Sequence, residues 1–144
     1  MADEPPDIRA TIRAGSVYKF PESTFSSTES HFFIVLNHDP LSDPFIALVC
    51  ASSKIEKVRR RRSHLPQETL VRINPDRYAD FTLPSIVDGN QVYQRSIGEL
   101  ELKIRRGQLE IKADMDMVFV RRLREAVKCS PMVEEEVKDL FLSC

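Results

Sequence analysis

The chain has 144 residues, of which 42% are hydrophobic and 30% charged, with a formal net charge of −1. This composition predicts one folded domain and excludes a wholly disordered chain. The three cysteines form no Cys-x-x-Cys pair and the three histidines form no zinc-binding motif, so we expect no disulfide framework, no metal and no cofactor. No apolar run approaches the length of a membrane helix and the acidic N-terminus lacks the features of a signal peptide, so we expect a cytoplasmic protein without a membrane partner.

Residues 1–95 are predicted to consist of a loose leader and a series of short strands. The leader, residues 1–14, shows no hydrophobic periodicity and is expected to be flexible. Residues 31–37 and 45–52 are aromatic, aliphatic and β-branched almost without interruption, which predicts two antiparallel strands buried on both faces. Shorter apolar stretches predict further strands over residues 15–20, 69–73 and 85–93.

The sequence Asp88-Gly89-Asn90 interrupts the last of these strands. An internal glycine predicts a bulge there, or a close approach by backbone or ligand. The same three residues also match an ordinary turn, and both interpretations stay open.

After residue 95 the hydrophobic pattern changes from a period of about 2 residues to one of about 3.6, which predicts helices. Ser96 and Glu99 match a capping box, and Gly107 stands where a C-terminal cap belongs, so we expect a helix between them. Residues 108–112 are ambiguous between strand and loop.

Two further helices are predicted towards the C-terminus. One starts at Asp114 or Asp116 and continues through Lys128. The other starts after Ser130, because serine suits an N-cap and Pro131 suits the first helical position.

This order of elements predicts a mainly β protein with C-terminal helices, an α+β architecture. A series of short strands is typical of a small closed barrel, because closure removes exposed strand edges. We therefore expect a barrel over residues 15–95 and a helical extension over residues 96–144 that packs on it.

The positive charge is concentrated in the middle of the chain. Residues 51–80 carry 8 basic and 4 acidic side chains, whereas residues 129–144 carry 1 and 4. Residues 59–62 are four consecutive arginines, which repel one another and are therefore expected on an exposed loop. This loop either binds phosphate, since guanidinium groups bind phosphate oxygens bidentately, or is only solvated.

Several strand sequences resemble those of a known family. The first predicted strand begins Gly-Ser-Val-Tyr, and the second begins at His31 with His-Phe-Phe-Ile-Val-Leu. The third ends in Ser52 and Ser53, and residues 84–90 have the sequence Pro-Ser-Ile-Val-Asp-Gly-Asn. Over residues 15–93 the chain resembles the PemK/MazF-like toxins of type II toxin–antitoxin systems. The resemblance implies an SH3-like β-barrel that forms a homodimer, cleaves single-stranded RNA without a metal ion, and is neutralised by an antitoxin protein.

The resemblance also implies which residues act on RNA. In the family, a basic residue at the start of the second strand and a Thr or Ser at the end of the third carry the chemistry, and these positions match His31 and Ser52, with Ser53 as the alternative to Ser52. Metal-free cleavage needs groups that move protons to and from the reacting oxygens, which histidine does near neutral pH, and positive charge for the phosphorane. The predicted RNA-binding residues are Ser53, Lys54, Arg59, Arg60, Arg61, Arg62, Asp88 and Asn90.

Additional candidates come from residue type alone. His64, beside the arginines, is a reserve acid or base, and Tyr18, Phe25 and Tyr93 are candidate stacking faces for unpaired bases.

Two other functions stay open. A non-catalytic barrel would use the basic segment to bind RNA, DNA or a protein, and an adaptor would recruit a partner through its helical tail. The ribonuclease requires His31 and Ser52 on one surface near the arginines, whereas the binding module requires only the basic patch. The adaptor predicts an exposed apolar groove.

Overall fold

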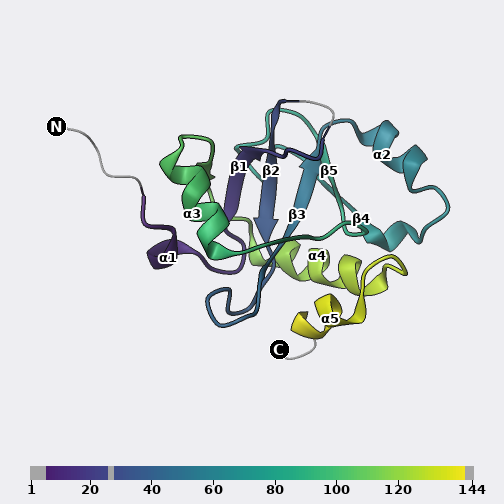
Figure 1. Cartoon of the computed structure of the whole chain (residues 1–144). Helices are drawn as coiled ribbons and strands as arrows, with labels where there is room; N and C mark the ends of the chain where they lie inside the picture. The colour runs from purple at the N-terminus through teal and green to yellow at the C-terminus, as the bar shows by residue number, and fades with distance from the viewer. Residues whose placement is uncertain (1–5, 26–27, 142–144) are drawn as a thin grey trace.

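The structure, a computed structural model, describes residues 6–25 and 28–141. In this part of the chain seven short strands form one antiparallel sheet, with helices on both faces (Figure 1). The strands are β1 (Val17–Pro21), β2 (Ser30–Val35), β3 (Ile46–Ser52), β4 (Leu70–Ile73), β5 (Ser85–Asp88), β6 (Tyr93–Arg95) and β7 (Glu110–Lys112). The helices are α1 (Ile8–Thr11), α2 (Ile55–Arg61), α3 (Ile97–Arg105), α4 (Met117–Cys129) and α5 (Glu135–Lys138), with short 3₁₀ turns η1 (Gln67–Thr69) and η2 (Asp139–Phe141).

The order of strands in the sheet is β4-β5-β3-β2-β1-β7, and β6 pairs with the beginning of β3. The expected class, a mainly β protein with helices, is confirmed. The expected closure into a barrel does not form among the described strands, because β4 and β7 end the order without pairing with each other. These edge strands have only four and three residues, and short edges expose little unpaired backbone even without closure.

Side-chain alternation along the strands divides the core into two parts. The first core lies on the face that carries Val49 and Ala51 and packs against α4 and α5. The second core lies on the face that carries Leu48 and packs against α1 and α3. The helices contribute Phe119, Val120, Leu123, Val127 and Val137 to the first core and Ile8, Leu100 and Ile104 to the second. Burial on both faces explains why β2 and β3 are apolar almost without interruption, as predicted.

The N-terminal segment differs from the flexible leader predicted for residues 1–14, although residues 1–5 lie outside the described residues. Ile8 begins the short helix α1 and is 1% exposed, within the second core. The Asp7 side chain accepts a hydrogen bond from the Arg9 backbone and caps the helix. Arg9 also forms an ion pair with Glu101 of α3. Ile8 and Ile12, four residues apart, are both buried in the second core. A single pair of apolar residues is too short a pattern to predict a helix from the sequence.

The capping residues in the sequence predicted the positions of α3 and α4 correctly. Ser96 and Glu99 form the predicted capping box, and Gly107 follows α3 with a φ of 69°, as expected of a C-terminal cap. Asp116 accepts a hydrogen bond from the Val118 backbone at the start of α4. The ambiguous residues 108–112 contain β7, which pairs with β1.

The helix predicted from Ser130 is displaced towards the C-terminus. Ser130 ends α4, and its hydroxyl accepts a hydrogen bond from the Met132 backbone in a turn. The short helix α5 begins only after Glu134. The prediction was wrong because serine followed by proline suits a turn after a helix as well as the start of one.

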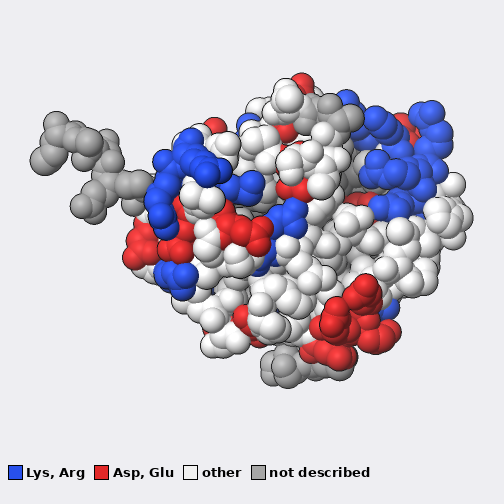
Figure 2. All heavy atoms as spheres, in the orientation of Figure 1, with Lys and Arg blue, Asp and Glu red and all other residues white. Residues whose placement is uncertain are grey.

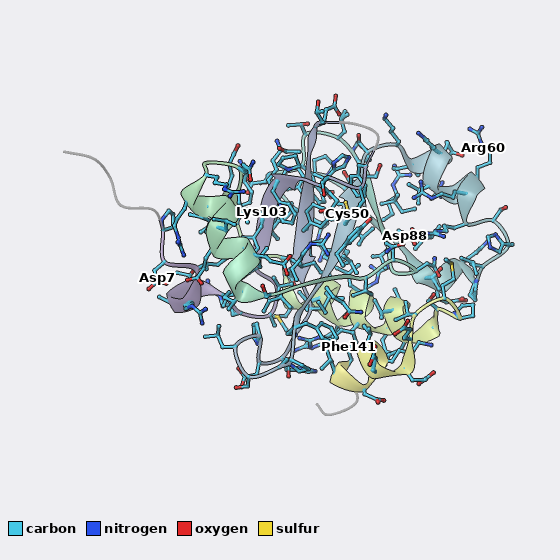
Figure 3. The ribbon with its side chains drawn as sticks, in the orientation of Figure 1. Asp7, Cys50, Arg60, Asp88, Lys103 and Phe141 are labelled. Carbon is cyan, nitrogen blue, oxygen red and sulfur yellow. The ribbon has the colours of Figure 1, made fainter. Side chains whose placement is uncertain are left out.

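The arginine-rich segment is helical, which corrects the predicted loop. Arg59, Arg60 and Arg61 form the last turn of α2, and Arg62 follows it. Their charges favour this place, because the C-terminal end of a helix carries the negative end of its dipole. Glu56 pairs with Arg59 one turn away. Figure 2 shows the resulting basic patch over α2, and Figure 3 shows Arg60 pointing away from the sheet.

No helix within the described ranges is long and apolar enough to cross a membrane.

Candidate functional site

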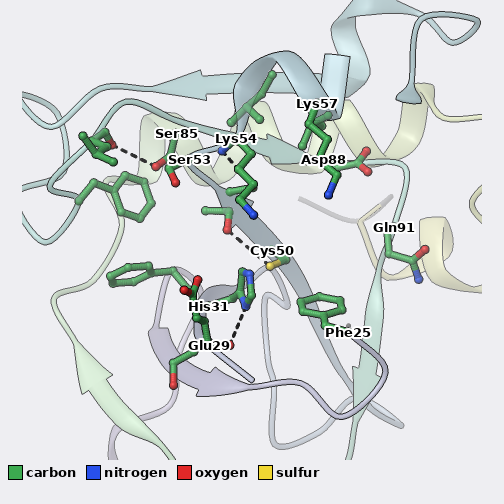
Figure 4. A pocket seen from close by; sticks show the side chains of 18 of the residues that line it. Phe25, Glu29, His31, Cys50, Ser53, Lys54, Lys57, Ser85, Asp88 and Gln91 are labelled. Carbon is green, nitrogen blue, oxygen red and sulfur yellow. Dashed lines mark hydrogen bonds between the residues drawn. The ribbon is translucent and has the colours of Figure 1, made fainter. Parts of the chain in front are cut away.

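A cavity of about 760 Å³ lies beside the second core, between α2 and the ends of β2, β3 and β5 (Figure 4). The strands bring His31, Ser52 and Asp88 to the same face of the sheet. Ser52 pairs with Ile86, and Asp88 follows Ile86 by two residues. β2 pairs with β3 up to Phe32 and Ala51, and His31 and Ser52 are the next residues along the same register. Residues far apart in sequence therefore meet at one end of the sheet.

The cavity collects most of the predicted site residues. Among the described residues, five basic and two acidic side chains line it, so its lining is positive even though the chain carries a net charge of −1. The predicted residues that line it are His31, Ser52, Ser53, Lys54, Arg61, Arg62 and Asp88, whereas Arg59, Arg60 and Asn90 do not.

His31 is half-buried and is oriented by two neighbours. Its Nδ1 lies 3.1 Å from the carbonyl oxygen of Glu29. Because a carbonyl can only accept, Nδ1 carries the hydrogen of this bond, and Nε2 is then the basic nitrogen of the neutral ring. The ring of Phe25 meets the imidazole edge to face, with centroids 4.9 Å apart.

Ser52 is the last residue of β3 and lies beside His31, and its side chain contacts the backbone at the start of α2. Its Oγ accepts a hydrogen bond from the backbone N–H of Lys54 at 3.2 Å. The hydroxyl proton remains available for donation to a ligand in the cavity.

Three lysines, Lys19, Lys54 and Lys57, line the cavity, and among the described residues none of them forms an ion pair. Lys19 lies over the ring of Phe32, with its Nζ 5.1 Å from the ring centroid. Figure 4 shows the side chains of Lys54, directly before α2, and Lys57, within it, extending into the cavity. Lys57 was missed from the sequence because the segment was predicted as a loop. In a helix, residues three apart point the same way, which puts Lys57 beside Lys54.

Three of the four predicted arginines have ion-pair partners. Arg62 Nε donates to Asp88 Oδ2 at 2.8 Å, and Arg61 lies 3.8 Å from the same oxygen. Arg59 pairs with Glu56 outside the cavity. The lysines, rather than the arginines, are therefore the cations that face the cavity without an ion-pair partner.

Asn90 lies behind the cavity wall and is 3% exposed. Its Nδ2 donates to Asp88 Oδ1 and to Thr69 Oγ1. These contacts give Asn90 a role in holding the turn after β5, and place it out of reach of a ligand in the cavity.

Of the remaining candidates, some line the cavity and others do not. Phe25 and Tyr93 line the cavity, with ring centroids 5.9 Å apart. Tyr18 is buried in the second core and does not reach the cavity. His64 is exposed and also lies outside it.

Cys50 forms part of the cavity wall and was not predicted there. Burial raises the pKa of its thiol to about 12, so the thiol is neutral at physiological pH. A neutral buried thiol is a poor nucleophile. Cys50 therefore shapes the cavity rather than reacting in it.

No group of three or more His, Cys, Asp or Glu side chains in the described ranges is arranged to hold a metal ion. Comparisons with protein-family models and with curated proteins give no match to this sequence. The chemistry of the cavity is therefore the basis for assigning a function.

Proposed function

We propose that the cavity binds single-stranded RNA and that the protein is an endoribonuclease that cleaves it without a metal ion. The observation that carries this proposal is the convergence of His31, Lys54 and Lys57 on one positively lined cavity. An imidazole next to ammonium groups provides both a proton acceptor and a site for phosphate. Phe25 and Tyr93 add faces on which unpaired bases can stack.

The reaction begins at the 2′-hydroxyl of the RNA. His31 Nε2 takes the proton while the oxygen attacks the adjacent phosphorus. The ammonium groups of Lys54 and Lys57 stabilise the charge that develops on the phosphorane, and Ser52 donates a hydrogen bond to one of its oxygens. The leaving 5′-oxygen takes a proton from water. The products are a 2′,3′-cyclic phosphate and a 5′-hydroxyl.

The remaining parts of this proposal rest on the resemblance of residues 15–93. They are an SH3-like fold, a homodimer, an antitoxin that neutralises the enzyme, and a cytoplasmic location. β3 pairs with β6 at its beginning and with β5 at its end. One strand that pairs with different neighbours at its two ends is typical of small, strongly bent sheets, and this supports the proposed SH3-like fold. Light scattering during gel filtration tests the homodimer.

A second candidate function is RNA binding without cleavage. His31 is the only imidazole that lines the cavity among the described residues, and the Cys50 thiol is held neutral. A site with a single group suited to proton transfer near neutral pH favours binding over catalysis.

The deciding experiment is cleavage of a long single-stranded RNA in EDTA. We expect the wild-type protein to cleave it and His31→Ala to lose activity by about 100-fold or more, the usual contribution of a general acid or base. His64→Ala is the matched control, because His64 is exposed and outside the cavity.

Each other outcome has a distinct meaning. Cleavage that survives in His31→Ala contradicts the role of His31. RNA that the wild-type protein retains in a gel shift but does not cleave supports the second candidate. RNA that is neither cleaved nor retained contradicts both.

A further inference from the structure

Helix α2 contains Lys57 and directly follows Lys54, but it has few contacts that hold it in place. It has seven residues, and Val58 is the only one that is buried. No side chain caps its N-terminus. A helix of this length is unstable in isolation, because the cost of nucleation exceeds the gain from its few hydrogen bonds. The position of Lys54 and Lys57 therefore depends on contacts between α2 and the rest of the protein.

The carboxylate of Asp88 is the principal polar contact of this kind. One oxygen, Oδ2, accepts the Arg62 Nε hydrogen bond at 2.8 Å directly after the end of α2. The side chains of Arg62 and Asp88 are only 12% and 11% exposed, so water screens this ion pair weakly. The other oxygen, Oδ1, accepts hydrogen bonds from the backbone and the side chain of Asn90, both at 3.0 Å.

The same network holds the segment that follows α2. The Asn90 side chain also donates to Thr69 Oγ1 at 2.8 Å, and Thr69 Oγ1 donates to the Pro66 carbonyl at 2.6 Å. Thr69 is completely buried. The end of α2 and the chain up to β4 are therefore connected through one carboxylate at the end of β5.

We infer that Asp88 is a positioning residue that fixes α2 so that Lys54 and Lys57 face the cavity, and that it does not bind the ligand. Both of its oxygens are already engaged by protein donors. A free carboxylate would repel a phosphate in this cavity, whereas one that holds two lysines in place promotes phosphate binding. The part of this inference that concerns RNA rests on the proposed function.

The two roles predict opposite effects of removing the charge. If Asp88 were only a negative charge in an RNA site, Asp88→Asn would strengthen RNA binding. If Asp88 positions α2, Asp88→Asn weakens binding, and we expect the dissociation constant to rise about tenfold. The probe is a single-stranded RNA with methylated 2′-hydroxyls, which this chemistry cannot cleave.

Glu56→Gln is the matched control, because Glu56 also pairs with an arginine of α2 but is exposed and does not line the cavity. It removes one negative charge near α2 and leaves the contacts of Asp88 in place, so RNA binding should stay unchanged. Asp88→Glu keeps the charge and should restore most of the affinity.

Hydrogen exchange gives a measurement that is independent of RNA. The amides of Val58 and Arg62 donate within and just after α2, and we expect them to exchange faster in Asp88→Asn, while the amides of β2 and β3 stay protected. Faster exchange throughout the protein would mean unfolding, and the test would then use Thr69→Val, which removes the hydrogen bond from Asn90 without changing a charge or the lining of the cavity. Weaker RNA binding by a folded Thr69→Val supports positioning, and binding equal to that of the wild type contradicts it.

The outcomes separate this inference from the proposed function. Equal or tighter RNA binding by a folded Asp88→Asn, or unchanged exchange in α2, overturns the positioning role. If the wild-type protein binds no RNA, the proposed function fails, and the exchange of α2 alone decides whether Asp88 positions it.

Discussion

Glu22 is a single buried side chain that makes the stability of the folded protein depend on pH. Its side chain is 3% exposed and accepts a hydrogen bond from Arg95 at 2.7 Å. Burial by itself would raise the pKa of Glu22, but hydrogen bonds from Arg95 and Thr24 outweigh it, so the pKa lies below its ordinary value. A carboxyl with a lowered pKa stabilises the folded state when ionised. This stabilisation is complete above the pKa of the unfolded chain, about 4.3, and is lost as the pH falls through the lower pKa of the folded protein.

We expect Glu22→Gln to reduce the free energy of unfolding by about 3 kcal/mol at pH 7, because it leaves Arg95 without its buried partner. The difference from wild type should shrink as the pH falls below about 4, where Glu22 itself becomes protonated. Urea unfolding at pH 7 and at pH 3 measures both values. Glu101→Gln is the control, since its ion pair with Arg9 is more exposed and should contribute about 0.5 kcal/mol. A difference that does not depend on pH would contradict the role of the Glu22 charge.

At the scale of the elements, the turn after β5 packs tightly against α4 and Thr69. A side chain at Gly89 would place its Cβ 2.8 Å from both the Ala126 Cβ of α4 and the Thr69 carbonyl oxygen. Gly89 does not have a positive φ, so its glycine is required by space and not by backbone conformation. The structure supports two of the interpretations that the sequence left open: Gly89 and Asn90 form a turn, and the backbone at Gly89 lies very close to α4 and to Thr69.

We expect Gly89→Ala to reduce the free energy of unfolding by about 2 kcal/mol, because the helix and the turn must move apart. Gly98→Ala is the matched control. Its Cβ would meet only Ser96 Oγ, at 3.9 Å, and alanine is the better helix former within α3, so it should stabilise the protein by up to about 1 kcal/mol. Thermal unfolding of the two variants tests this, and equal midpoints would contradict the packing argument.

For the whole molecule, the sheet depends on segments from both ends of the chain. β7 pairs with β1, and α4 covers the first core with Phe119, Val120 and Leu123. Ile8 of α1 fills the second core. A barrel that ends at residue 95 would expose the apolar faces of β2, β3 and β5 to water.

We therefore expect a fragment of residues 15–95, the span predicted as the barrel, not to fold by itself. Its amide NMR spectrum should lack the dispersion expected of the full chain. Hydrophobic burial dominates folding, and this fragment lacks the helices that cover both faces of the sheet. A dispersed spectrum from the fragment would show instead that residues 15–95 form an independent unit.

Features that depend on near neighbours could be predicted from the sequence. The apolar runs of β2 and β3 and the capping box of α3 could be predicted because both depend on residues within one element. The positive charge near residue 60 could be counted directly, whereas His31 and Ser52 became candidates through the resemblance of their strands to a known family.

Features that depend on distant neighbours could be seen only in the folded protein. The arginine segment is helical because Val58 and Arg62 contact the rest of the protein, and residues 108–112 contain a strand because β1 offers them an edge. Lys57 lines the cavity although it was not predicted there, and Asn90 was predicted there but does not line it. Both outcomes depend on contacts that no local sequence pattern shows. The physical reason is that the hydrogen bonds within a short segment stabilise it too little to favour one conformation. Its conformation is therefore set by burial and by pairing with the rest of the chain.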